Sequence, residues 1–99
     1  MQRLKSLLLI SLTLVLMPLA VAQAEEVCKV TDPTGTPLNV RAAPNGRIVS
    51  TLKNGREVYI EEITTDDKGK PWAKISLGIR GTKLVLGWVL REFISCYQR

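Results

Sequence analysis

Short stretches in which apolar and polar residues alternate recur along the chain beyond residue 24. In residues 38–41, apolar Leu and Val alternate with polar Asn and Arg, and residues 72–77 alternate in the same way. Further short runs rich in Val, Ile and Leu cover residues 27–31, 56–65 and 84–90. A period of two is typical of strands with one buried face, and no longer window has the period of a helix. The pattern therefore predicts short β-strands.

Turn-forming residues separate these stretches. Clusters of Gly, Pro, Asn and Asp occupy residues 32–37, 44–46, 54–55, 66–71 and 78–81. Short strands with turn signals every 8 to 12 residues or so are typical of a small all-β barrel or sandwich.

Residues 56–77 form the clearest local unit, because two strand-like stretches flank the polar segment 66–71. We expect an antiparallel hairpin here. Val58 and Ile60 follow a period of two but Ile63 does not, which predicts a bulge or a strong twist within the first strand.

The first 24 residues have the features of a secretory signal peptide. A short basic start precedes a Leu-rich apolar run over residues 6–21, and the small-x-small sequence Ala-Gln-Ala follows. We therefore expect cleavage after Ala24, which leaves residues 25–99 as one mature domain. Cleavage after Ala22 and retention as a membrane anchor stay open, but Pro18 and the small residues at the end of the run favour cleavage. The expected location is secreted, periplasmic or cell-envelope.

Two cysteines, Cys28 and Cys96, lie near the two ends of the predicted mature domain. An even number of cysteines in a short exported chain indicates a disulfide. Closing so long a loop would stabilise a small domain by roughly 4 kcal/mol in the chain-entropy model. Neither cysteine belongs to a C-x-x-C motif, so a structural bridge is favoured over a reactive thiol. The bridge requires that the two chain ends meet.

Composition argues against catalysis and against a bound cofactor or metal. The chain contains no histidine, which excludes imidazole as a general base or metal ligand. Glu61 and Glu62 are neighbours on a predicted strand and would point to opposite faces. Asp66 and Asp67 fall in the polar segment 66–71 between the two expected strands, which offers too few oxygen ligands for a calcium loop. We therefore expect no enzyme activity, no cofactor and no metal site.

The charge indicates a soluble, mildly basic surface. Because two basic residues lie in the predicted signal peptide, residues 25–99 carry a net charge of +3 rather than the +5 of the whole chain. The basic residues are scattered, and an exported chain is a poor candidate for nucleic-acid binding. We also expect no stable membrane insertion after signal cleavage.

Four sequence blocks, taken in order, resemble bacterial SH3 (SH3b) domains. They are Leu-Asn-Val-Arg-Ala-Ala-Pro at 38–44, the strand region 48–58, Trp-Ala-Lys-Ile at 72–75, and Gly-Trp-Val at 87–89 followed by Phe93. Each block is weak singly, but together they cover most of the predicted mature domain.

The resemblance implies a small SH3-like barrel of five to six antiparallel strands with a short helical turn, residues 90–93, before the last strand. The first and last strands of such barrels lie side by side, as a bridge between Cys28 and Cys96 requires. The expected core consists of Val40, Ile48, Leu52, Val58, Ile60, Ile75, Val89 and Ile94.

The resemblance also implies a non-catalytic binding module that recognises a cell-wall (peptidoglycan) peptide or glycan. The alternative is a protein-interaction module that docks an exported envelope enzyme or receptor. The aromatic and basic residues expected at the binding surface are Asn39, Arg41, Trp72, Trp88, Arg91 and Phe93. Core packing is the favoured role for Trp88, whereas Trp72 is expected either in the core or as an exposed apolar platform.

Overall fold

The computed structural model describes residues 25–99, so the expected signal peptide lies outside the described residues. Within this part of the chain no helix is long and apolar enough to cross a membrane. The elements, in chain order, are β1 (Glu26–Val30), β2 (Leu38–Arg41), β3 (Ile48–Leu52), β4 (Glu57–Thr65), β5 (Pro71–Ile79), β6 (Thr82–Leu90), the 3₁₀ turn η2 (Arg91–Phe93) and β7 (Ile94–Gln98).

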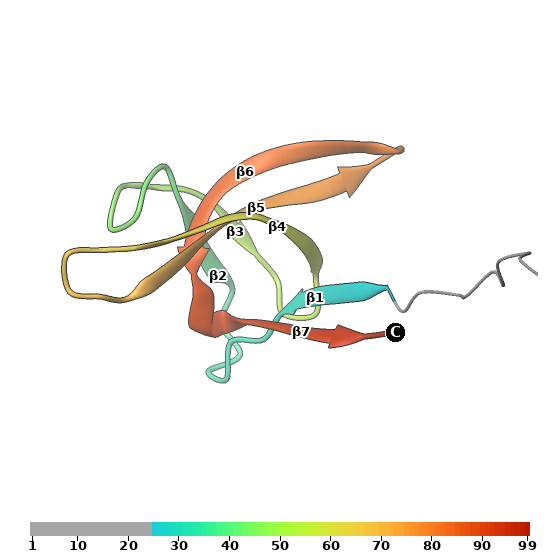
Figure 1. Cartoon of the computed structure of the whole chain (residues 1–99), viewed down its shortest axis with the longest axis horizontal. Helices are drawn as coiled ribbons and strands as arrows, with labels where there is room; N and C mark the ends of the chain where they lie inside the picture. The colour runs from blue at the N-terminus through green and yellow to red at the C-terminus, as the bar shows by residue number, and fades with distance from the viewer. Residues whose placement is uncertain (1–24) are drawn as a thin grey trace, which may run out of the picture.

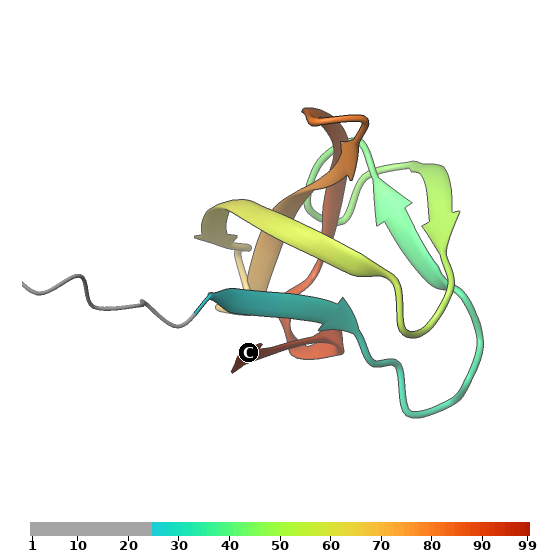
Figure 2. The same ribbon diagram turned by 90° about the vertical axis from the view of Figure 1, so that its right-hand side faces the viewer.

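The seven strands form one antiparallel sheet in the order β3-β2-β6-β5-β4-β1-β7. The sheet curls into half a barrel around a single core (Figures 1 and 2). The expected all-β architecture and the short helical turn before the last strand are confirmed. The expected number of five to six strands is too low, because the described part of the chain forms seven.

The hairpin predicted over residues 56–77 is present as β4 and β5. Its register shifts between Ile60 and Glu62. This is the bulge that was predicted because Ile63 does not follow the period of two. The bulge bends β4, so that the beginning of the strand pairs with β1 and most of its length pairs with β5.

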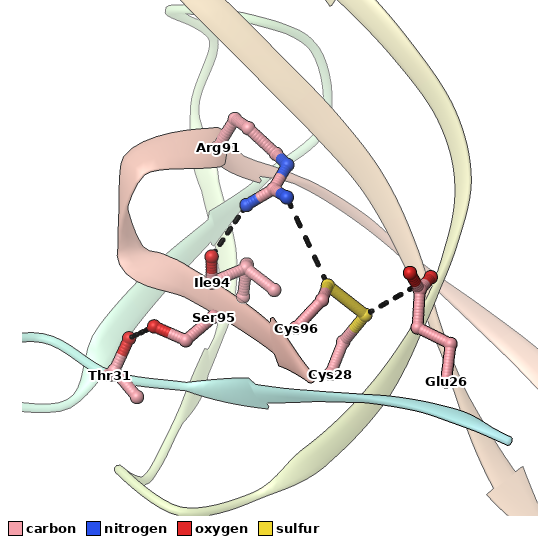
Figure 3. Close-up of a disulfide and its surroundings, with 7 residues drawn as sticks. All are labelled: Glu26, Cys28, Thr31, Arg91, Ile94, Ser95 and Cys96. Atoms are coloured by element: carbon pink, nitrogen blue, oxygen red, sulfur yellow. Dashed lines mark hydrogen bonds between the residues drawn. A yellow bond between two sulfur atoms is a disulfide. The ribbon is translucent and has the colours of Figure 1, made fainter. Parts of the chain in front are cut away.

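The two ends of the domain meet in the β1–β7 pair. Cys28 lies directly opposite Cys96 in the register, and the two residues form a disulfide (Figure 3). Beside it, Thr31 and Ser95 join their hydroxyl groups in a hydrogen bond of 2.6 Å. These contacts close the sheet at one edge.

The core lies on the concave face of the sheet and contains most of the residues expected there. Val40, Val89 and Ile75 are fully buried, and Ile60 is half-buried against the same cluster. The expectation for Ile48 is wrong, because its side chain is 51% exposed. The register of β2 with β3 shifts after Val40, so that Ile48 pairs with Arg41 on the outer face of an edge strand.

Gly87 permits the close approach of β6 to β2. Its φ of 148° is one that side chains with a Cβ rarely adopt. A Cβ built there would lie 2.5 Å from the backbone oxygen of Arg41 and 3.1 Å from Cγ1 of Val40. A glycine at this position therefore lets β2 join the barrel.

Candidate functional site

A pocket of about 150 Å³ opens where the loop before β2 meets the beginning of β5 and the 3₁₀ turn η2. Four of the six expected site residues line it, although they come from three separate segments of the chain. The lining residues are Asp32, Thr36, Pro37, Leu38, Asn39, Arg41, Trp72, Leu90 and Phe93.

The floor of the pocket is apolar. Leu38 and Trp72 are buried, with 5% and 3% of their surfaces exposed, and Phe93 is half-buried against the core cluster. Of the two roles expected for Trp72, the exposed platform is wrong, because the side chain is buried. The side chain is buried beside the β4–β5 loop rather than in the main core cluster, which takes Ala73 and Ile75 from the other face of β5.

The indole N–H of Trp72 is directed toward the β4–β5 loop. Its Nε1 donates to Oδ2 of Asp66 at 3.0 Å, and Nδ2 of Asn45 donates to the same oxygen at 3.0 Å. The other carboxylate oxygen, Oδ1, accepts from the backbone N–H groups of Lys68 and Lys70, both at 2.9 Å. Four donors thus surround this carboxylate, which ties the loop to the tryptophan.

These donors hold the pKa of Asp66 well below its usual range. The hydrogen bond from Trp72 is the largest cause, and the bond from Asn45 follows. Because donors stabilise the charged form, Asp66 stays ionised at neutral pH. Its role is to fix the indole of Trp72, and thereby a part of the pocket floor.

Two charged side chains reach the pocket from opposite ends of the segment 32–41. Arg41 donates from Nη1 to the backbone oxygen of Gly46 at 2.8 Å, which directs its guanidinium along the turn after β2. Asp32 accepts at Oδ1 from the backbone N–H and the hydroxyl of Thr34, at 2.9 and 2.6 Å. The exposed side chain of Asn39 lies between these two residues in sequence. The pocket therefore offers both a cation and an anion above an apolar floor.

Two of the expected site residues do not line the pocket. Arg91 lies in η2 but turns toward the disulfide, where it donates to the backbone oxygen of Ile94 and lies 3.9 Å from Sγ of Cys96 (Figure 3). Trp88 is half-buried and pairs in register with Arg41 and Lys74. The core position favoured for Trp88 is wrong, because these strand partners hold it on the outer face, where Nζ of Lys74 lies 6.0 Å from its ring centre.

Residues of the loop before β2 are the part of the pocket that the sequence reasoning missed. The segment 32–37 is rich in Pro, Gly and Thr, and it was expected only to form a turn. In the structure Asp32 caps this turn and Asn54 donates to the backbone oxygen of Thr36 at 3.3 Å, which fixes the loop against the pocket. The Asp-Pro-Thr-Gly sequence predicts the turn but not the direction in which it folds.

The size of the pocket limits what it can hold. Its volume of about 150 Å³ is below the 300–1,000 Å³ or so of typical small-molecule sites. One side chain, one terminal residue of a peptide or part of a sugar ring fits. The arrangement is thus that of a recognition pocket for a residue-sized group.

Comparison of the chain with family models, with characterised proteins and with solved structures finds no match.

Proposed function

We propose that this chain is an exported, non-catalytic binding module of the SH3b type whose pocket recognises a component of the cell-wall peptide. The observation that carries the proposal is the convergence of Asn39, Arg41, Trp72 and Phe93 on one pocket. A surface that only had to be soluble would have no reason to gather these side chains around an apolar hollow.

The chemistry of the pocket favours a short peptide end. Nη1 of Arg41 is used by Gly46, but the guanidinium has further N–H donors that can bind a carboxylate. Asp32, at the other end of the lining segment, can accept from an ammonium group. Wall stem peptides carry both carboxylate and amine groups on small residues, and the apolar floor can cover an aliphatic side chain. The volume of the pocket matches one such residue.

Retention on purified sacculi tests the proposal. Arg41→Gln and Asn39→Ala should each weaken retention by about fivefold or more, since truncating an anchor commonly costs more than about 1 kcal/mol. The matched control is Arg47→Gln, because Arg47 is an exposed arginine outside the pocket lining. Thermal unfolding of each variant shows whether the fold is retained.

Two results would contradict the proposal. The first is that the wild-type chain does not bind sacculi, a result that would favour the alternative in which the module docks an exported envelope protein. Equal losses for Arg41→Gln and Arg47→Gln are the other, because they would attribute the binding to net charge alone.

A further inference from the structure

The outer end of the β5–β6 hairpin extends past its sheet neighbours β4 and β2 (Figure 1). The register of β4 on β5 ends at Ser76, and β6 pairs with β2 only at Trp88. In the described part of the chain, residues 77–84 therefore pair only with one another, as a two-stranded ribbon. We call residues 77–85 the hairpin tip.

The hairpin tip exposes aliphatic side chains on both of its faces. Leu77 is itself buried in the core, and on the same face Leu84, its partner in the register, and Ile79, two residues along, continue beyond the core. Ile79 is 41% exposed and Leu84 51% exposed. On the opposite face, Val85 is 53% exposed.

The sequence of β5, β6 and their flanking residues is basic. The sequence from Lys68 to Arg91 contains six basic residues and no acidic one. Within the hairpin tip, Lys83 lies with its Nζ 4.5 Å from the ring centre of Tyr59 and 3.7 Å from Oε2 of Glu61. Arg80 makes no ion pair within residues 25–99, so its charge is available to an external anion.

Arg80 occupies a position that the fold itself does not favour for arginine. Arg80 and Gly81 form the two-residue turn between β5 and β6, with φ values of 51° and 79°. Turns with two positive φ values favour Asn, Asp or Gly at the first position. The arginine therefore makes the turn less stable than Asn or Gly would, and its charge forms no ion pair within residues 25–99 that would offset this cost.

We propose that the hairpin tip docks reversibly on membranes that contain anionic phospholipid. The aliphatic side chains enter the interfacial region, while Arg80 and Lys83 meet the phosphate groups of the lipids. A membrane fits better than a protein surface, because a protein docked on one face of the ribbon would leave the other face exposed. A membrane interface that the tip enters end-on surrounds both faces of the ribbon, so it covers Leu84 and Val85 together.

This docking goes beyond the proposed function and uses a different part of the molecule. Trp72, in the pocket, lies near the beginning of β5, whereas Ile79 lies at its end. Docking through the tip involves no membrane-spanning segment, and it would hold the pocket away from the lipid.

Co-sedimentation with vesicles tests the proposal. The test uses residues 25–99, which hold every described strand, the disulfide and the core, because the apolar segment before them would bind lipid by itself. Vesicles of phosphatidylglycerol and phosphatidylethanolamine are compared with vesicles of phosphatidylcholine at low ionic strength. We expect binding to the anionic vesicles only, and release as salt is added.

The sharpest variant is Arg80→Asn, because it removes a charge while placing a favoured residue in the turn. Its unfolding temperature should equal or exceed that of the wild type, and its partitioning onto anionic vesicles should fall about fivefold, which corresponds to about 1 kcal/mol per charge. The matched control, Arg47→Asn, removes the same charge from an exposed loop outside the hairpin tip. It should retain most of the binding.

The two faces are tested separately by Leu84→Ser and Val85→Ser, each of which should weaken vesicle binding. A loss confined to one of these variants would contradict end-on docking. Equal losses for Arg80→Asn and Arg47→Asn, or no binding of the wild type to anionic vesicles, would overturn the proposal. Self-association of the wild type that Leu84→Ser abolishes would also overturn it, by making the tip a contact between copies of this chain.

Discussion

Cys28 and Cys96 face each other at a position where β1 and β7 exchange no backbone hydrogen bonds. The N–H of Arg99 donates to the oxygen of Glu25 at 2.9 Å, and the N–H of Thr31 donates to that of Phe93 at 2.8 Å. Since bonded and non-bonded pairs alternate along an antiparallel ladder, the cysteines fall at a non-bonded pair, where the strands approach most closely. Their Cα atoms are 4.0 Å apart. The disulfide therefore joins the strands where the ladder itself provides no bond.

Removing the bridge should destabilise the domain strongly. The cysteines are 68 positions apart, so the Cys28→Ala/Cys96→Ala variant should lose roughly 4 kcal/mol in the free energy of unfolding. Urea unfolding with and without a thiol reductant measures this loss. The reductant should lower the midpoint of the wild type and leave that of the double variant unchanged. Equal midpoints for the wild type and the double variant without reductant would refute the expectation.

Gly87 should tolerate alanine less well than Gly81 does. Both have positive φ values, but a Cβ at Gly81 meets nothing within 4 Å, whereas one at Gly87 meets the backbone of Arg41. Gly87→Ala should therefore cost about 1–3 kcal/mol more than Gly81→Ala, the usual range for forcing an extra methyl group into a packed site. Chemical unfolding of both variants gives the difference, and a similar loss in the two would argue against close packing of β6 on β2.

Acid should destabilise the wild type through Asp66. Its pKa is lower in the folded protein than in the unfolded chain, so the unfolded chain takes up a proton first as pH falls. The contribution of Asp66 to stability is complete above the ordinary Asp pKa of about 4 and is lost progressively below it. Melting temperatures from pH 7 to pH 2 should fall more steeply for the wild type than for Asp66→Asn. Parallel curves would exclude this contribution.

Trp72→Phe should separate the two roles of the tryptophan. The variant keeps an aromatic ring in a buried position but removes the Nε1 donor to Asp66. We expect a lower melting temperature at pH 7 and a pKa of Asp66 nearer to its ordinary value, which carbon-detected NMR of the carboxyl group can follow. An unchanged pKa would show that the indole N–H does not hold the carboxylate.

Trp72→Ala is expected to act mainly on stability. A residue that is 3% exposed leaves a cavity when it is truncated, at a cost of about 3–5 kcal/mol. Because the side chain is buried, this variant does not report on ligand binding alone. Denaturant midpoints measure the loss, and a midpoint close to that of the wild type would mean that the site repacks.

Much of the fold was predictable because its signals are local. The turn between β4 and β5 follows from a cluster of polar residues, and the bulge in β4 follows from the phase of Ile63. The meeting of the chain ends was predictable because a bridge between Cys28 and Cys96 demands it. The exposure of Ile48 was not, since it depends on a register shift between β2 and β3 that no residue type signals.

The candidate site was predictable only in part. Asn39 and Arg41 belong to one strand, so their proximity needs no tertiary information. The direction of Arg91 depends on a hydrogen bond to Ile94 and on the nearby disulfide, and both exist only after the barrel has closed. Arg91 is the first residue of a short 3₁₀ turn, and the sequence of the turn does not determine to which side of the sheet its side chain points.

The alternation of apolar residues, the spacing of turns and the two cysteines were sufficient by themselves to determine an all-β domain whose ends are joined. Those features act over a few residues or through a single covalent bond, so they can be read without knowing where other segments lie. Only the tertiary structure decided that Trp72 is buried beneath Asp66, that the loop at Asp32 closes one side of the pocket, and that the β5–β6 hairpin extends beyond its neighbours. Each of these outcomes depends on how segments that are distant in sequence pack against one another, and this packing is a property of the whole folded chain.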